Sequence, residues 1–235
     1  MRRRKTEFKL PAIILQVRLD SSRLPGKALL LLDGKPLALR VMEALNNVPA
    51  RLRILACPED SLAALSPLAD EAGFQIIAGP KEDVLERFCM AIRHFSINRV
   101  IRATGDNPFV FADAAAALNA EATALNADYS GYSGLPHGAG VESVSADALL
   151  RAGTEAALPY EREHVCPYLY NHPELFRLHR PLAPPQWQDN SSIRLTVDTQ
   201  EDFDRAAELY AAIKDDPQRY TGSAIINRYM EIFKG

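Results

Sequence analysis

The chain has 235 residues, of which 47% are hydrophobic and 24% are charged, and its formal net charge is −3. This composition is typical of a globular domain and excludes a disordered chain, a fibrous repeat and a coiled coil. Four of the first five residues are basic, so 23 of the 27 basic residues remain against 30 acidic ones, and this acidic body is a poor general binder of nucleic acid or anionic membranes.

Alternating strand and helix patterns occupy the first half of the chain. Short apolar runs, such as 12–17, are typical of strands buried on both faces of a sheet. The predicted order is strand 12–17, helix from about 36, strand 53–56, helix 63–72, strand 75–78, helix 82–95, strand 99–103 and helix 112–125. Four strand–helix units in succession predict an α/β fold with a mostly parallel central sheet and helices on both faces.

The second half of the chain is less regular. Residues 129–140 are rich in glycine, serine and tyrosine, which predicts a loop. Three prolines within 181–190 indicate an irregular segment outside the regular helices and strands. The further predicted elements are strands 141–144 and 192–197 and helices 146–157, 162–170, 201–214 and 223–233. We expect a basic tail at 1–10 and a single domain over 11–235, with an insertion at about 129–190 for substrate binding or dimerisation.

The three cysteines, Cys57, Cys89 and Cys166, lie far apart in the sequence. Their number and spacing predict neither a disulfide framework nor a zinc site and fit a reducing compartment. No apolar run approaches the roughly 20 residues that a membrane span requires. The basic tail either contacts an anionic surface or is a solvated terminus. We expect a soluble, cytoplasmic protein without a membrane or nucleic-acid partner.

A basic loop follows the first predicted strand. It carries Arg18, Arg23 and Lys27, with two serines at 21–22 and a glycine at position 26. Ligands of open parallel sheets bind at the carboxyl ends of the strands, and arginine and lysine side chains there suit phosphate oxygens. The loop lacks the glycine patterns of a P-loop and of a dinucleotide-binding fingerprint. It is therefore either a polyphosphate site of another kind or a solvated charged loop.

Two aspartates each follow a predicted strand. Asp106 comes after the strand at 99–103, and Asp198 comes after the strand at 192–197. If both strands end at the same edge of the sheet, the two carboxylates can share one Mg²⁺ ion, which typically takes one or two carboxylates plus substrate phosphates. Alternatively, each aspartate caps the helix that follows it.

Six segments, in order along the chain, resemble those of one enzyme family. They are 22–27 preceded by Arg18, 82–85 with Arg87, 104–106, 161–165, 167–168, and 196–199 followed by 201–202. On these segments the sequence resembles the cytidylyltransferase family, which includes the CMP-Kdo and CMP-acylneuraminate synthetases. The resemblance is greatest to the branch of spore coat polysaccharide biosynthesis proteins, and it covers most of the chain.

The resemblance implies a fold and a reaction. The fold is a Rossmann-like nucleotide-diphospho-sugar transferase fold. In the reaction, CTP and an acceptor give a CMP-linked product and pyrophosphate, with Mg²⁺ as the cofactor. In the members that activate sugars, an anomeric hydroxyl attacks the α-phosphorus. Relatives are often homodimers, so the implied partners are CTP, a small sugar-like acceptor and a second copy of the chain.

The resemblance also implies roles in the nucleotide half of the site. The cations of the basic loop would hold the β- and γ-phosphates and stabilise the leaving pyrophosphate. The two aspartates would hold Mg²⁺ on the α-phosphate, where it acts as Lewis acid and template. The catalytic set would be Arg18, Lys27, Asp106 and Asp198, and Ser22 and Arg23 would complete the nucleotide loop.

Base selection would involve Asp83, Arg87 and Thr104. Asp83 lies near a predicted helix start, so it either contacts the cytosine edge or caps the helix. Arg87 either contacts the base or pairs with Asp83 one helical turn earlier. Thr104 ends a central strand beside Asp106 and is the better candidate of the three.

The acceptor side would involve Glu142 and a cluster formed by Glu161, Arg162 and His164. His164 could act as a general base or bind an anionic substrate. The alternative for the cluster is a surface turn in which Arg162 forms salt bridges with the glutamates on either side of it. We favour a role in substrate binding or dimerisation.

Two departures from the family pattern bear on activity. Asp20 stands in the first loop where relatives commonly have glycine, and Gly140 replaces an aspartate within residues 138–142. We expect a Mg²⁺-dependent cytidylyltransferase that activates a sugar or sugar-like acid for surface polysaccharide or glycoconjugate synthesis. The alternatives are a phosphonate or phosphate acceptor and a nucleotide-binding homologue without turnover.

Overall fold

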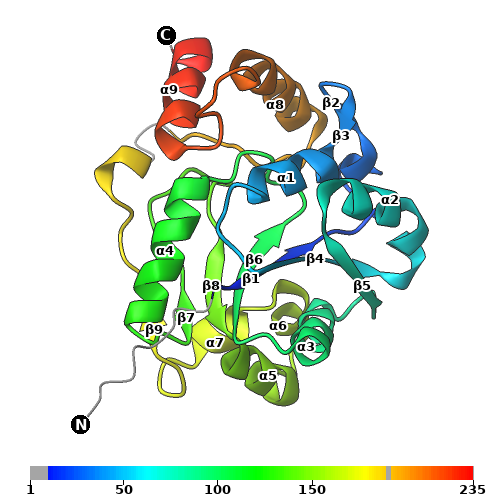
Figure 1. Cartoon of the computed structure of the whole chain (residues 1–235), viewed down its shortest axis with the longest axis vertical. Helices are drawn as coiled ribbons and strands as arrows, with labels where there is room; N and C mark the ends of the chain where they lie inside the picture. The colour runs from blue at the N-terminus through cyan, green and yellow to red at the C-terminus, as the bar shows by residue number, and fades with distance from the viewer. Residues whose placement is uncertain (1–9, 189–191, 235) are drawn as a thin grey trace.

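The central sheet is mostly parallel, as the sequence predicts (Figure 1). The computed structural model describes residues 10–188 and 192–234, and in this part of the chain seven strands pair in the order β5-β4-β1-β6-β8-β7-β9. The strands are β1 (Ala12–Gln16), β4 (Leu52–Pro58), β5 (Gln75–Gly79), β6 (Arg99–Thr104), β7 (Tyr129–Ser130), β8 (Glu142–Ser145) and β9 (Leu178–His179). The tail predicted at 1–10 lies outside the described residues, except for Leu10.

The sheet changes direction at β8. Strands β5, β4, β1 and β6 run parallel to one another, whereas β8 pairs antiparallel with β6 and β7 pairs antiparallel with β8. A separate two-stranded hairpin is formed by β2 (Leu31–Leu32) and β3 (Lys35–Pro36). The carboxyl ends of β1 and β6, which are adjacent in the sheet, therefore meet at one edge.

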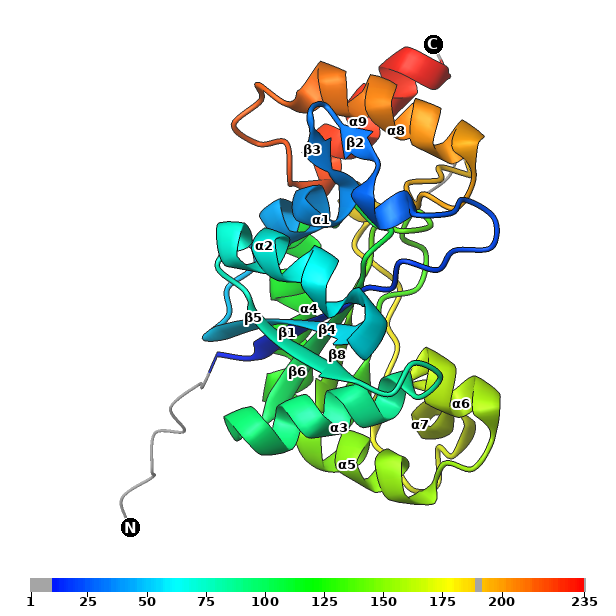
Figure 2. The same cartoon turned by 90° about the vertical axis from the view of Figure 1, so that its right-hand side faces the viewer.

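Helices cover both faces of the sheet, which confirms the predicted fold class (Figure 2). Successive side chains of a strand point to opposite faces. Ile13 and Leu15 therefore pack with the helices at 37–45, 62–72 and 112–124, and Ile14 packs with the helices at 84–95, 146–155 and 167–171. The helices are α1 (Leu37–Leu45), α2 (Leu62–Ala72), α3 (Val84–Phe95), α4 (Ala112–Ala124), α5 (Ala146–Glu155), α6 (Pro159–His164), α7 (Pro167–Asn171), α8 (Gln200–Ile213) and α9 (Gly222–Phe233), with 3-10 turns η1 (Lys27–Leu29), η2 (Glu59–Ser61) and η3 (Pro185–Trp187).

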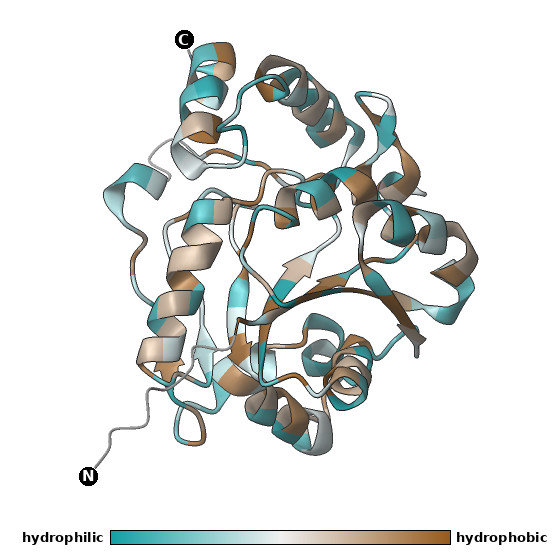
Figure 3. Ribbon diagram, viewed as in Figure 1, coloured by the Kyte–Doolittle hydropathy of each residue, from teal (hydrophilic) through white to brown (hydrophobic). Residues whose placement is uncertain are grey.

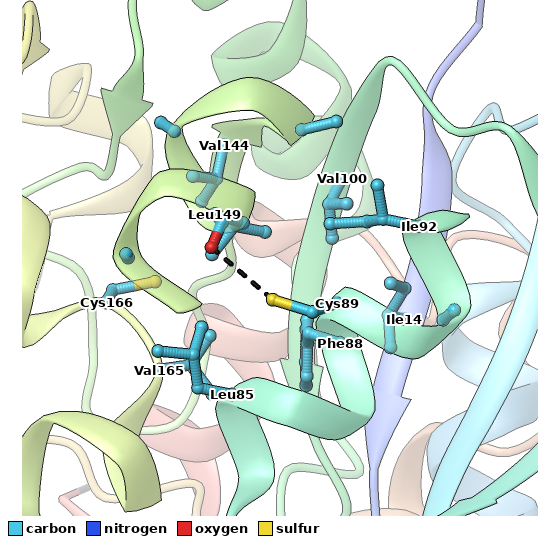
Figure 4. Close-up of a cluster of buried hydrophobic side chains, with 14 of the residues drawn as sticks. Ile14, Leu85, Phe88, Cys89, Ile92, Val100, Val144, Leu149, Val165 and Cys166 are labelled. Atoms are coloured by element: carbon cyan, nitrogen blue, oxygen red, sulfur yellow. Dashed lines mark hydrogen bonds between the residues drawn. The ribbon is translucent and has the colours of Figure 1, made fainter. Parts of the chain in front are cut away.

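Helix α3 forms its contact with the sheet because its apolar residues recur at helical spacing. Leu85, Phe88, Cys89 and Ile92 are all buried, and they pack with strands of the sheet and with α5 (Figure 4). The Cys89 thiol donates to the Leu149 carbonyl oxygen of α5 at 3.5 Å. The central strands are the most continuous hydrophobic segments of the chain, and polar residues lie mainly on the outer helices and loops (Figure 3).

The segment 192–197 is not a strand of the sheet, contrary to the sequence prediction. It is extended, but its backbone partners lie outside the strands of the sheet: the Leu195 nitrogen donates to the His137 oxygen at 2.8 Å, and the Val197 nitrogen donates to the Asp106 oxygen at 2.8 Å. The alternating apolar residues Ile193, Leu195 and Val197 are buried in a third core cluster with α8 and α9. The alternation therefore indicates an extended segment correctly, but the surface that it covers belongs to the C-terminal helices.

The single helix predicted at 162–170 is two short helices, α6 and α7. The break falls at Val165, whose φ of 72° lies in the left-handed region. Pro167 then occupies the first turn of α7, where its missing N–H is tolerated. No helix in the described part of the chain is long and apolar enough to cross a membrane.

Candidate nucleotide site

A pocket of about 280 Å³ opens at the carboxyl ends of β1 and β6. Loop 18–27 forms one side of it, α6 lies across from that loop, and Figure 2 shows both on the same side of the molecule. The pocket brings together nine of the predicted site residues, namely Arg18, Ser22, Arg23, Lys27, Arg87, Thr104, Asp106, His164 and Asp198. Four others do not line it: Asp83, Glu142, Glu161 and Arg162.

A wider depression of about 570 Å³ lies beside α1 and α8. Its charges are largely paired with one another, since Arg40 donates to Glu43 and Lys214 donates to Asp33. Its lining residues come from these helices and from turns rather than from the ends of parallel strands. Ligand sites of such sheets lie at the carboxyl ends of strands, so we assign function to the smaller pocket.

Asp106 and Asp198 converge on the ammonium group of Lys27. The Lys27 Nζ donates to Asp198 Oδ1 at 3.0 Å, to Asp106 Oδ2 at 3.2 Å and to the Val197 oxygen at 2.7 Å. The two carboxylates, which lie far apart in the sequence, thus already share one cation. In the described part of the chain, no group of three or more His, Cys, Asp or Glu side chains has metal-site geometry. A carboxylate pair of this kind suits an ion that completes its shell with phosphates and water.

Neither aspartate caps a helix, which was the alternative interpretation. The N-cap of α8 is Thr199, whose hydroxyl accepts from the Asp202 nitrogen at 3.2 Å. Helix α4 begins after Phe111, several residues beyond Asp106. Both carboxylates are therefore free of a capping role and face the pocket.

The orientation of Asp106 is fixed from the neighbouring strand end. The Thr104 hydroxyl donates to Asp106 Oδ1 at 2.7 Å, and the Asn107 side-chain amide donates to the same hydroxyl oxygen, Thr104 Oγ1, at 2.8 Å. Thr104 therefore positions Asp106 while its own side chain lines the pocket.

Asp198 is a charged carboxylate at neutral pH. Burial by itself would raise its pKa, but the hydrogen bond from Lys27 and the charges of Lys27, Arg23 and Arg194 outweigh burial and hold the pKa below its usual value. Arg23 Nη2 lies 2.9 Å from Asp198 Oδ1, and Arg194 Nη2 lies 2.8 Å from Asp198 Oδ2. Three cations thus surround a single carboxylate.

Asp198 reaches the pocket because two backbone contacts hold its segment. The Val197 nitrogen donates to the Asp106 oxygen at 2.8 Å, which ties the two aspartates together through the backbone. On the other side, Gly138 lies so close that a Cβ there would be 2.5 Å from the Thr196 nitrogen. Gly138 also has a φ of 94°, a conformation that glycine adopts readily.

We expect Gly138→Ala to destabilise the protein and to move Asp198 away from Asp106. The overlap of the new Cβ involves backbone atoms, so a side-chain rotation cannot relieve it. Together with the left-handed φ, it is expected to lower the free energy of unfolding by about 2 kcal/mol or more. Urea unfolding measures this loss. Gly140→Ala is the matched control, since its Cβ would meet only the Leu135 side chain, at 3.1 Å; equal losses in both variants would contradict this account.

The loop after β1 carries its charges in two directions. Arg18 faces α6, where its Nη1 donates to Glu163 Oε1 at 3.4 Å, and both side chains are about half exposed. Asp20 Oδ2 pairs with Lys81 Nζ at 3.0 Å, and its Oδ1 lies 4.0 Å from Arg18 Nε. The carboxylate that departs from the family pattern is therefore neutralised mainly by Lys81, which does not line the pocket. Gly26, with a φ of 67°, makes the turn that leads to Lys27.

Arg87 is buried at the wall of the pocket, with 1% of its surface exposed. Its Nη1 donates to the Pro80 and Lys81 oxygens, whereas its buried Nε has no hydrogen-bond partner. Burial lowers the pKa of the guanidinium. In the described residues no ion pair joins Arg87 to Asp83, so the surface pair considered from the sequence does not form. A buried cation without a carboxylate partner favours an anionic ligand nearby.

Asp83 and Arg162 connect α3 to α6 outside the pocket. Asp83 Oδ1 accepts from the Glu86 nitrogen at 2.9 Å and so caps α3. Its Oδ2 accepts from Arg162 Nε at 2.6 Å. Arg162 also donates to the Ala156 oxygen at 2.9 Å, so it pairs with α3 and α5 rather than with the glutamates beside it.

Two of the four residues predicted for the acceptor side, Glu161 and His164, lie in different surroundings. Glu161 is buried, and its side chain accepts from the Leu158 nitrogen at 3.4 Å at the start of α6. His164 is exposed, lines the pocket and packs against the Tyr160 ring, with 4.6 Å between the centroids.

Arg102 lines the pocket and was not identified from the sequence. Its Nε donates to Gln16 Oε1 at 3.1 Å, and its Nη1 donates to Glu142 Oε2. Glu142 also accepts from the Tyr129 hydroxyl at 2.8 Å. Because Glu142 does not line the pocket and Arg102 does, Glu142 acts on the pocket through Arg102. The signal in the sequence is a charged residue between Ile101 and Ala103 in the middle of strand β6, because a charge among buried apolar residues requires a partner.

Known proteins resemble this chain over most of its length. Residues 12–225 match the cytidylyltransferase family. The spore coat polysaccharide biosynthesis protein SpsF of Bacillus subtilis is 31% identical over 211 residues, which is 87% of this chain and 88% of the relative.

Two solved structures have a similar fold. One is a cytidylyltransferase from Leptospira borgpetersenii, with a TM-score of 0.85, 22% identity and 94% of each chain covered. The other is a CMP:2-keto-3-deoxy-manno-octonic acid synthetase complexed with CTP, with a TM-score of 0.66, 17% identity and coverage of 86% of this chain and 99% of that one. The match over residues 12–225, with a pocket at the carboxyl ends of β1 and β6, leads to one conclusion: this chain belongs to the cytidylyltransferase family, whose members are nucleotidyltransferases.

Proposed function

We propose that the protein transfers CMP from CTP to a sugar or sugar-acid acceptor in a Mg²⁺-dependent reaction that releases pyrophosphate. The observation that carries this proposal is the convergence of Asp106 and Asp198 on one cation, inside a pocket that arginine and lysine side chains line. A nucleoside triphosphate needs both features, because its phosphates require cations and its metal requires carboxylates.

In the nucleotide half, loop 18–27 is proposed to bind the triphosphate. Arg18, Arg23 and Lys27 would hold the β- and γ-phosphates, and Ser22 would donate to a phosphate oxygen. Binding would replace the present partners of these cations. Arg18 now pairs with Asp20 and Glu163, Arg23 pairs with Asp198, and Lys27 pairs with both Asp106 and Asp198. The buried charge of Arg87 supports an anionic or carbonyl group of the nucleotide at the pocket wall.

Asp106 and Asp198 would hold the metal ion, since their facing oxygens already share a cation. When bound, Mg²⁺ supplies Lewis-acid polarisation of the α-phosphate. Thr104 keeps Asp106 in place for this role. To contact the base, as proposed, Asp83 would have to give up its hydrogen bond from the Glu86 nitrogen or the one from Arg162.

In the chemical step, an acceptor hydroxyl oxygen bonds to the α-phosphorus. The bond from that phosphorus to the bridging oxygen breaks, and pyrophosphate leaves with its electron pair. His164 is the proposed base for the hydroxyl proton, because it is exposed at the pocket. Glu161 and Arg162 would hold α6, which carries His164, against α3 and α5.

The acceptor class is proposed from the relatives. The protein of B. subtilis is named for spore coat polysaccharide biosynthesis, and the solved synthetase is named for a CMP-linked octonic acid. These names support a sugar-like acceptor and a role in surface polysaccharide or glycoconjugate synthesis. We further propose that the 11–235 domain is cytoplasmic. We also propose that it forms a homodimer through an insertion at about 129–190, and sedimentation at several protein concentrations tests this association.

The nucleotide half is tested by calorimetry with CTP, ATP, GTP and UTP, each with and without Mg²⁺. We expect CTP to bind in preference to the others and Mg²⁺ to strengthen its binding. A preference for another nucleotide would overturn the assignment to CTP. Pyrophosphate release with a panel of sugar acids, phosphates and phosphonates then identifies the acceptor, and CTP binding without release from any of them would indicate a homologue without turnover.

A further inference from the structure

We propose that Arg194 is a positioning residue that fixes the Asp198 carboxylate from behind, so that one defined oxygen faces the metal. This inference rests on the proposed role of Asp198 as a metal ligand. Arg194 does not line the pocket, so it would act on the ligand only through Asp198.

The two oxygens of Asp198 have different surroundings. Oδ1 faces the pocket, where Lys27 Nζ lies at 3.0 Å and Arg23 Nη2 lies at 2.9 Å. Oδ2 faces away from these groups and accepts from Arg194 Nη2 at 2.8 Å. Rotation of the carboxylate plane would break the Arg194 hydrogen bond, so one oxygen stays toward the shared cation.

Arg194 is itself held by a carboxylate that is almost fully buried. Its Nε donates at 2.9 Å to Oδ1 of Asp202, which is 7% exposed in the first turn of α8. The other oxygen of Asp202 accepts from the backbone nitrogens of Asp198 and Thr199, both at 3.1 Å. The contacts therefore form a closed ring from the Asp198 side chain through Arg194 and Asp202 to the Asp198 backbone.

The ring requires the shape of a guanidinium group. Two nitrogens of Arg194 bond two different carboxylates at once, which a planar fork of donors can do and a single ammonium cannot do with the same geometry. Partners that orient a metal ligand typically contribute about 10-fold to 100-fold in metal affinity or activity. A structural role alone would affect stability and leave the metal unaffected.

The test is the strengthening of CTP binding by Mn²⁺, measured as the ratio of the CTP dissociation constants without and with the metal. Arg194→Gln is expected to reduce this ratio about 10-fold or more, at the lower end of the range for such partners, while metal-free CTP binding stays unchanged. Arg194→Lys, which keeps the charge, is expected to reduce it less. If Arg194→Gln does not fold, Arg194→Lys against the wild type decides the question.

Arg205→Gln is the matched control. Arg205 also contacts Asp202, at 3.5 Å, but it does not contact Asp198. We expect this variant to keep the Mn²⁺ effect on CTP binding. Equal reductions in the Arg205 and Arg194 variants, or no reduction in either, would overturn the positioning role.

Asp198→Asn separates this inference from the proposed function. If Asp198→Asn abolishes the Mn²⁺ effect while Arg194→Gln preserves it, only the positioning role fails. If Asp198→Asn itself preserves the Mn²⁺ effect, the assignment of Asp198 as a ligand fails, and the inference about Arg194 fails with it.

Discussion

Asp198→Asn is expected to lower CTP-dependent pyrophosphate release by about a thousand-fold with the fold intact. Asparagine keeps the size of the side chain but removes the negative charge of Asp198. With Asp106, that charge now binds Lys27, and the metal would require it. A metal ion contributes several kcal/mol of charge stabilisation to such a transition state, and each 1.36 kcal/mol is a factor of about ten in rate. Initial rates at saturating Mg²⁺ measure the loss, and circular dichroism checks the fold.

Asp20→Asn is the control for this result. Asp20 lies within loop 18–27 but does not line the pocket, and its shortest ion pair, at 3.0 Å, is with Lys81, whereas Arg18 Nε is 4.0 Å away. Its charge is therefore expected to be dispensable for turnover. Wild-type turnover in Asp198→Asn would defeat the ligand assignment, and a large loss in Asp20→Asn would show that the charge of the whole loop, rather than the aspartate pair, governs the rate.

Lys27→Met is expected to change two affinities in opposite directions. Binding of CTP should weaken, because the phosphates lose a cation. Binding of Mn²⁺ to the nucleotide-free protein should strengthen about ten-fold or more, because two carboxylates would face each other without Lys27. Unit charges about 4 Å apart interact by about 1 to 4 kcal/mol. Calorimetric titration of each ligand separately measures both changes.

Lys81→Met is the matched variant for this experiment. Lys81 also bridges two aspartates, Asp20 and Asp60, but on the outer side of the loop. Neither affinity should change in it. A fall in Mn²⁺ affinity in Lys27→Met would mean that the aspartates are held apart without the lysine and do not form a shared site.

The layout of the pocket follows from features that a sequence displays. Polar residues after buried parallel strands gather at one edge of the sheet, and the loop after β1 and Asp106 after β6 do line the same pocket. The capping role of Asp83 was one of two predicted alternatives, since an aspartate before an apolar helical pattern satisfies free backbone N–H groups.

Other parts of the site depend on contacts that no local pattern specifies. The segment before Asp198 has the alternation of a strand, yet its partner is the loop at 137–139, which is distant in sequence. Arg194 looks like the solvent-facing residue of such a strand, although it bonds two carboxylates. Arg162 stands between two glutamates but pairs with Asp83, because tertiary packing of α6 on α3 decides its partner.

The reversed direction of β8 has a consequence for how the enzyme can diversify. Because β8 runs antiparallel to β6, it is the beginning of β8, with Glu142, that lies beside the carboxyl end of β6. The register continued two residues further places Gly140 opposite Thr104. The connection that enters β8 therefore lies beside the carboxyl end of β6, where its Gly138 packs against the segment before Asp198, whereas loop 18–27 is the connection that leaves β1. Substitutions within residues 131–141 would therefore alter the pocket through the segment that carries Asp198, whereas substitutions in loop 18–27, which lines the pocket, would alter it directly.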